Sequence, residues 1–242
     1  MIARSVNGVM LAALICTGWA GLLVFTLGVL PLEAAAWAGA PLLALQCWLY
    51  VGLFILGHDA MHGTLAPAWP RLNAAIGRLA LFAYVGFPFE ATRRKHHAHH
   101  RHAGLDGDPD HHHSNRFWPW YGAFLQQYFS WANALFVGAV LSGLLVIGVP
   151  WQKALLFWAA PAVLSSLQLF TFGTYLPHRR TKQRFPDQHH ARSNDWPEWV
   201  SLFTCFHFGY HHEHHLEPGE PWWRLPLRRR HRQSSAIQEA QA

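Results

Sequence analysis

Long stretches without a charged side chain constrain this fold more than any other feature of the sequence. No Asp, Glu, Lys or Arg lies between Arg4 and Glu33, and positions 9–30 give 22 mostly apolar residues. A helix of that length is about 33 Å long, enough to cross the hydrocarbon core of a bilayer. A second uncharged run covers positions 34–57, and the Pro-Leu-Glu hinge between the runs predicts a tight transmembrane hairpin.

The second half of the chain repeats this arrangement. Positions 132–149 and 154–177 are uncharged and separated by a short turn, so they predict a second hairpin. The apolar segment 72–89 is shorter and contains Arg78, which favours an interfacial helix over a crossing. We therefore expect an all-α integral membrane protein in which residues 1–242 form one domain, with a four-helix transmembrane bundle and a histidine-rich helical cap. The basic, then Ser- and Gln-rich tail, 228–242, predicts disorder.

The positive charge is distributed unevenly over this topology. Only 13% of the residues are charged, against about 25% in an ordinary soluble domain. Of the 19 Lys and Arg, only Lys153 lies on the side of the hairpin turns. This bias predicts that the side with all the others is cytoplasmic, and it favours a membrane surface over nucleic acid as the partner of a chain with net charge +6. Three isolated cysteines predict neither a disulfide framework nor a thiolate metal site.

Nineteen histidines are far more than packing requires, and many follow a helical spacing. At separations of three and four residues, side chains share one face of a helix and can present several nitrogens to one point. Three clusters show this pattern: His58 with His62, His96 with His99 and His100, and His211 with His214 and His215. Eight imidazoles exceed what one tetrahedral ion can bind, so the clusters predict a pair of metal ions.

Other polar residues lie close to these clusters in the sequence. His178 ends the last predicted span and is the natural ninth ligand, while His207 is either a tenth ligand or a supporting residue. Because imidazoles are neutral, carboxylates should orient them and offset the metal charge. The candidates by position are Asp59, Asp108, Asp110 and Glu213. We expect His97 and His212 to point away from the ligands, and the remaining histidines, His189 and His190 among them, to lie in solvated loops.

At these residues the chain resembles the membrane-bound fatty acid desaturase and hydroxylase superfamily, which has three histidine boxes around a di-iron centre. The stretches at 57–63, 172–179 and 206–215 are similar to bacterial β-carotene ketolases. The resemblance implies that the nine ligands are His58, His62, His96, His99, His100, His178, His211, His214 and His215. Membrane desaturases have an Asn four residues before the histidine that corresponds to His178, whereas this chain has Thr174.

The resemblance also implies an activity and a location. Ketolases oxidise C4 of β-ionone rings, taking β-carotene through echinenone to canthaxanthin, or hydroxylated rings such as those of zeaxanthin towards astaxanthin. Breaking an unactivated C–H bond needs a redox-active metal, which favours iron over zinc. We therefore expect two Fe ions, O2 as co-substrate, an electron-donor protein such as ferredoxin, a carotenoid substrate taken from the lipid bilayer, and residence in the bacterial inner membrane.

Three other functions compete with this interpretation. A carotenoid hydroxylase or a lipid desaturase would use the same di-iron core. The segment 58–62 also resembles the HExxH helix of zinc proteases, but with Asp in place of the general-base Glu, and that function leaves seven patterned histidines unused. A metal transporter predicts polar residues along the spans, and the first, second and fourth predicted spans contain almost none.

Overall fold

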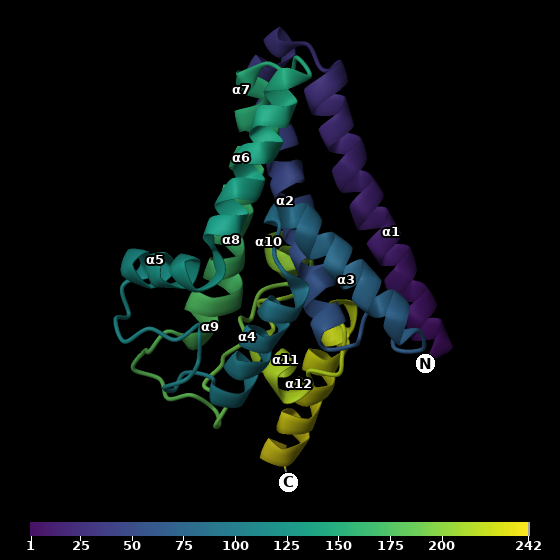
Figure 1. The fold of residues 1–242 in the computed structure, drawn as a ribbon. Coiled ribbons are helices and arrows are strands. Elements are labelled where there is room, and N and C mark those ends of the chain that lie inside the picture. Colours follow the sequence, from purple (N-terminus) through teal and green to yellow (C-terminus); the bar gives the residue numbers. More distant parts are fainter. Residues whose placement is uncertain (242) are drawn as a thin grey trace.

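A computed structural model describes residues 1–241, and this part of the chain is all-helical without a β-strand (Figure 1). The α-helices are α1 (Ile2–Val24), α2 (Ala35–Met61), α3 (Pro70–Val85), α4 (Phe89–His102), α5 (Phe117–Tyr128), α6 (Trp131–Val146), α7 (Trp151–Ala154), α8 (Ala160–Leu169), α9 (Leu176–His178), α10 (Glu198–Cys205), α11 (His211–Leu216) and α12 (Leu225–Gln241). Short π-helical segments continue three of them: η1 (Phe25–Val29), η3 (Leu155–Ala159) and η4 (Phe170–Tyr175). Two 3₁₀ turns, η2 (Leu32–Ala34) and η5 (Trp222–Arg224), precede α2 and α12.

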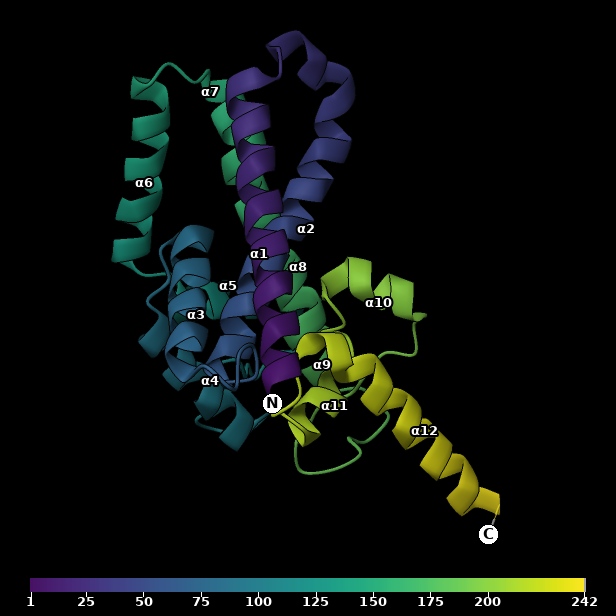
Figure 2. The same cartoon turned by 90° about the vertical axis from the view of Figure 1, so that its right-hand side faces the viewer.

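Two helical hairpins run side by side, one formed by α1 and α2 and the other by α6 and α8 (Figures 1 and 2). Both turns and α7 lie at the same end of the molecule, and the termini lie at the other end together with α4, α9, α11 and α12. Lys153 joins the two turns, because its buried ammonium group donates a hydrogen bond to the carbonyl oxygen of Leu30 at 2.8 Å. The predicted pair of hairpins is therefore present, with Lys153 at the turn end.

Helix α2 is the centre of the structure and contacts α1, α3 and α8. Its side chains are apolar around the whole circumference, as expected for a helix buried among others. Tyr50, Val51 and Ile55 are completely buried. Helix α1 packs closely against this core, since a Cβ atom added at Gly8 would lie 1.8 Å from the backbone oxygen of Leu65.

Three helical segments are long and apolar enough to cross a membrane: Ile2–Val29, Trp37–Met61 and Trp151–His178. They correspond to the predicted first, second and fourth spans. Large apolar side chains remain exposed along the outer helices, with Leu14 67% and Leu135 74% exposed, as expected for surfaces that face lipid.

The predicted third span differs from the structure. Helix α6 has 16 residues, so it is about 24 Å long and shorter than a hydrocarbon core of about 30 Å. Only together with α5, from which it is bent by 86°, does it qualify as a candidate span. The predicted interfacial segment 72–89 is likewise α3 followed by a 97° bend, and Phe89 already begins α4.

The prediction of a disordered tail is wrong for residues 228–241, which belong to α12; residue 242 lies outside the described part. The tail contains mainly good helix formers, among them Arg, Gln and Ala. Ion pairs also anchor its first turns: Arg228 Nε lies 3.0 Å from Glu217, and Arg229 Nη1 lies 3.2 Å from Glu213. The basic residues at the start of the tail thus fasten it to the rest of the protein.

Candidate metal centre

Four helices bring the patterned histidines together at the end of the molecule opposite the hairpin turns. The last turn of α2 and the residue after it provide two, α4 provides three, α9 provides one and α11 provides three. They form two groups, in each of which one possible ligand atom per residue lies within 4.8 Å of the others. Group one is His58, His62, His96, His100 and His214, and group two is His99, His178, His211 and His215. These are the nine histidines that the sequence singled out as ligands.

In group one the imidazoles meet through their Nε2 atoms. The Nε2 of His214 lies 3.1 Å from that of His58 and 3.0 Å from that of His100. The Nε2 of His96 lies 2.7 Å from that of His62. Five nitrogens therefore converge on the same small volume. Two come from the first cluster, two from the second and one from the third.

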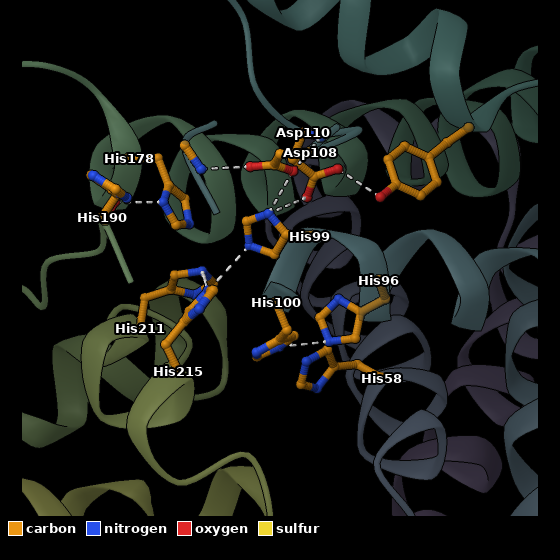
Figure 3. A network of polar contacts seen from close by, with 12 residues as sticks. His58, His96, His99, His100, Asp108, Asp110, His178, His190, His211 and His215 are labelled. Atoms are coloured by element: carbon orange, nitrogen blue, oxygen red, sulfur yellow. Dashed lines mark hydrogen bonds and ion pairs between the residues drawn. The ribbon is translucent and has the colours of Figure 1, made fainter. Parts of the chain in front are cut away.

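Group two has the same arrangement deeper in the protein. The Nε2 of His215 lies 3.1 Å from that of His99 and 3.0 Å from that of His211 (Figure 3). The fourth member, His178, has a buried Nε2 without a hydrogen-bond partner among the described residues. A ligand atom held towards a metal would have this environment.

The spacing and the protonation of these rings fit metal ligation. Two nitrogens at right angles around a transition metal, each about 2.1 Å from it, lie about 3 Å apart, as the Nε2 atoms do here. Burial, followed by the proximity of other imidazoles, lowers the pKa of His96, His211, His214 and His215 well below the usual value. The rings are therefore neutral at pH 7, which is the form that binds a metal. Imidazole is a suitable ligand for iron.

For His58 and His178, a hydrogen bond at Nδ1 determines which nitrogen the ring offers to a metal. The Nδ1 of His58 donates to Asp59 at 3.2 Å, and the Nδ1 of His178 donates to the carbonyl oxygen of His190 at 2.8 Å. An Nδ1–H that is held in this way leaves Nε2 as the free ligand atom. Asp59 is itself held by the backbone N–H of Trp222 at 3.0 Å.

Two aspartates, Asp108 and Asp110, lie beside the Nδ1 atom of His99 in group two (Figure 3). The Nδ1 of His99 donates to Asp108 at 2.9 Å and lies 3.8 Å from Asp110. Burial favours the neutral imidazole, but these carboxylates outweigh it and raise the pKa of His99. Burial also raises the pKa of Asp110 to about 6. Because an imidazole that binds a metal is neutral, it would not offset the charge of a bound cation, and Asp59, Asp108 and Asp110 are the acids placed to do so.

Two residues proposed from the sequence do not join this site. Glu213 is buried, but its carboxylate accepts hydrogen bonds from Ser193 and Arg229 rather than from a ligand histidine. His207 belongs to neither group, and its ring stacks on that of Tyr210 at 5.8 Å. Both residues lie beside the third cluster in the sequence. Their side chains nevertheless contact Tyr210, Ser193 and Arg229 instead of the ligand histidines.

Of the histidines expected to lie outside the site, His97 and His212 match the prediction and His190 does not. His97 and His212 point away as expected, towards the carbonyl oxygen of Met61 and the carboxylate of Asp187. His190 does not lie in a solvated loop. It is half-buried, its Nδ1 donates to the carbonyl oxygen of Ala103 at 2.9 Å, and its own carbonyl holds His178. No local spacing marks His190, because its partners are far away in the sequence.

A largely apolar cavity of about 450 Å³ adjoins both groups. Its wall includes His58 and His96 from group one and His99 and His211 from group two. The remainder comes mainly from apolar and aromatic side chains of α2, α3, α5, α6 and α8. Phe208 lies beside the histidines, with its ring centroid 4.6 Å from that of His58 and 5.2 Å from that of His211. The cavity is in the size range of small-molecule sites.

The fold and the site define a class: a helical membrane protein with two adjoining polyhistidine groups and an apolar cavity against them. A family model described as fatty acid desaturase matches residues 32–137 and 123–239. The chain belongs to the fatty acid desaturase family.

Individual relatives are more informative about chemistry. The chain is 50% identical over 230 residues to a β-carotene ketolase of Paracoccus sp. (strain PC1), which covers 92% of this chain and 91% of that protein. It is 50% identical over 205 residues to a β-carotene ketolase of Paracoccus sp. (strain N81106 / MBIC 01143), covering 82% and 83%. A zeaxanthin 4-ketolase of Chlamydomonas reinhardtii is 35% identical over 251 residues, which is 96% of this chain and 55% of that protein.

Proposed function

We propose that this protein is an O2-dependent oxygenase that converts the C4 methylene of β-ionone rings into a ketone. Its substrates would be β-carotene, giving echinenone and then canthaxanthin, and hydroxylated rings such as those of zeaxanthin, giving astaxanthin. The observation that supports this most strongly is that histidines of both groups form part of the wall of one apolar cavity. The similarity to proteins named as ketolases indicates the substrate class.

The two histidine groups would hold two iron ions. Iron supplies the oxidising power for C–H cleavage that no side chain possesses. The protein orients the imidazoles through Asp59 for His58, Asp108 for His99 and the His190 carbonyl for His178. Phe208 and the other apolar wall residues exclude water and bring a ring carbon towards the histidines.

The reaction needs two rounds at the same carbon. In the first, the C4 methylene, O2, two electrons and two protons give a C4 alcohol and water. In the second, the alcohol consumes the same reactants and becomes a geminal diol, which loses water to leave the ketone. Because no side chain in the site can store these electrons, an external donor of the ferredoxin class would supply them.

The charge distribution supports a location for the site. The histidine groups lie at the end of the molecule opposite the hairpin turns. Lys153 lies at the turn end, beside Leu30. The other Lys and Arg residues belong to segments outside the two hairpin turns. Positively charged residues favour the cytoplasmic side, so we place the site at the cytoplasmic face of a bacterial inner membrane. A cytoplasmic electron donor would reach the histidine end, and the carotenoid would enter from the bilayer.

Expression in a bacterial host that makes β-carotene tests this function. The expected products are echinenone and canthaxanthin, identified by chromatography and mass, because a ketone extends the conjugated system and reddens the pigment. His211→Ala should abolish them, whereas His231→Ala, at an exposed position outside both groups, should not. Accumulation of 3-hydroxylated carotenoids would identify a hydroxylase instead, and unchanged carotenoid with altered lipids would identify a desaturase.

A further inference from the structure

Thr174, a buried residue in the cavity wall, has a hydroxyl group without a hydrogen-bond partner among the described residues. Among the described residues, Thr174 makes no side-chain hydrogen bond, although it is only 4% exposed and lines the cavity. The other threonines all donate to backbone carbonyl oxygens; they are Thr17, Thr26, Thr64, Thr92, Thr171, Thr181 and Thr204. A hydroxyl that lines a largely apolar cavity and makes no bond within the protein is available to a polar atom of a bound molecule.

The backbone around Thr174 is π-helical. Thr174 lies in the π-helical segment η4, where the N–H of Leu176 donates to the carbonyl oxygen of Thr171 five residues before it. Thr171 lies in the same segment, but its hydroxyl donates to the carbonyl oxygen of Leu167 at 2.7 Å. Thr174 also lies four residues before His178 of group two, and it lines the same cavity as His99 and His211 of that group.

The other buried or half-buried hydroxyls in the cavity wall are already engaged. Tyr84 bonds Ser165 at 3.0 Å, and Tyr121 bonds Ser166 at 2.7 Å. Tyr128 donates to Asp110 at 2.6 Å. Thr174 is therefore the hydroxyl that can bind an oxygen atom on a bound molecule without losing a bond within the protein.

We propose that the Thr174 hydroxyl hydrogen-bonds the C4 hydroxyl of the half-oxidised ring and retains this alcohol for the second oxidation. The inference rests on the proposed function, because only a reaction in two rounds produces such an alcohol. The ring of β-carotene has no polar atom to engage Thr174, so with this substrate the contact is gained after the first round. The hydrogen bond holds the alcohol in the largely apolar cavity. Without this bond, the alcohol would return to the bilayer.

The test compares three variants of the full-length protein in membranes of a host that makes β-carotene. Thr174→Val removes the hydroxyl at nearly constant shape, and Thr174→Ser restores it. Thr171→Val is the matched control, because it removes a hydroxyl that bonds only its own helix, at 2.7 Å. The readout is the ratio of 4-hydroxylated to 4-keto carotenoids.

We expect Thr174→Val to raise this ratio about tenfold, corresponding to the loss of one hydrogen bond of ordinary strength. Thr174→Ser and Thr171→Val should stay close to the parent ratio. A parent-like ratio in Thr174→Val, while the parent makes ketone, would overturn this inference and leave the proposed function intact. If the parent itself makes no ketone, the proposed function and this inference fail together.

A second measurement covers a Thr174→Val protein that forms no product. Purified protein is titrated with 4-hydroxy-β-carotene and with β-carotene, and the ratio of the two dissociation constants is compared with the parent's. We expect the preference for the alcohol to fall about tenfold. An unchanged preference would overturn the role of Thr174.

Discussion

The substitution Asp108→Asn tests whether a carboxylate that orients a ligand histidine contributes to metal binding. Asp108 accepts hydrogen bonds from His99 Nδ1 at 2.9 Å and from the backbone N–H groups of Gly104 and Asp110, each at 2.8 Å. Asparagine keeps the shape and a carbonyl oxygen, but it removes the negative charge and one acceptor. We therefore expect the fold to survive and His99 to become a weaker ligand in group two.

The size of the effect follows from the contact that is lost. A hydrogen bond to a charged group contributes about 1.5–3 kcal/mol, and each 1.4 kcal/mol corresponds to about a tenfold change in affinity. This agrees with the roughly 10–100-fold loss of metal affinity that follows removal of residues supporting a ligand. In an anaerobic Fe(II) titration of purified protein, one of two binding steps should weaken by that factor, and the step assigned to group one should not change.

Asp187→Asn is the matched control for this experiment. Asp187 accepts a hydrogen bond from a histidine at a similar distance, 2.8 Å, but that histidine, His212, belongs to neither group. Its replacement should leave both binding steps as in the parent. Two unchanged steps in Asp108→Asn, or equal weakening in both variants, would refute the argument that Asp108 acts by orienting a ligand.

Two glycine substitutions test the packing around the site. Gly8→Ala would place a Cβ 1.8 Å from the backbone oxygen of Leu65. We therefore expect the free energy of unfolding to fall by about 1–3 kcal/mol, with a lower midpoint of thermal unfolding in detergent. Gly173→Ala would place a Cβ 2.9 Å from the ring of Phe208, so we expect lower ketone yield at unchanged iron content as that ring moves within the cavity. Gly28→Ala, with nothing within 4 Å, is the control for both, and parent-like behaviour of either test variant would contradict the packing described.

The sequence predicted the hairpins well because hydropathy and the absence of charge are local properties. It placed the start of the third span at residue 132, one residue from the start of α6, but it predicted neither α5 nor the 86° bend, since the apolar run continues through both. A local signal did exist there: Ser130 and Asn133 form a capping box at the start of α6, which marks a helix beginning inside the run.

The histidine groups were predictable because helical spacing fixes which side chains share a face. The supporting residues were not. Asp108 and Glu213 both lie near a histidine cluster in the sequence, but only Asp108 contacts a ligand, because Arg229 engages Glu213. His190 was missed for the same reason, since it contacts His178 across a loop.

Counting iron in the purified protein tests the central claim most directly. If the two histidine groups each hold an ion, the parent should contain two irons per chain. His62→Ala in group one and His211→Ala in group two should each lower that number towards one, whereas His231→Ala should not. A parent without bound iron, or variants that keep the parent's full iron content, would contradict the assignment of these histidines as ligands of a metal pair.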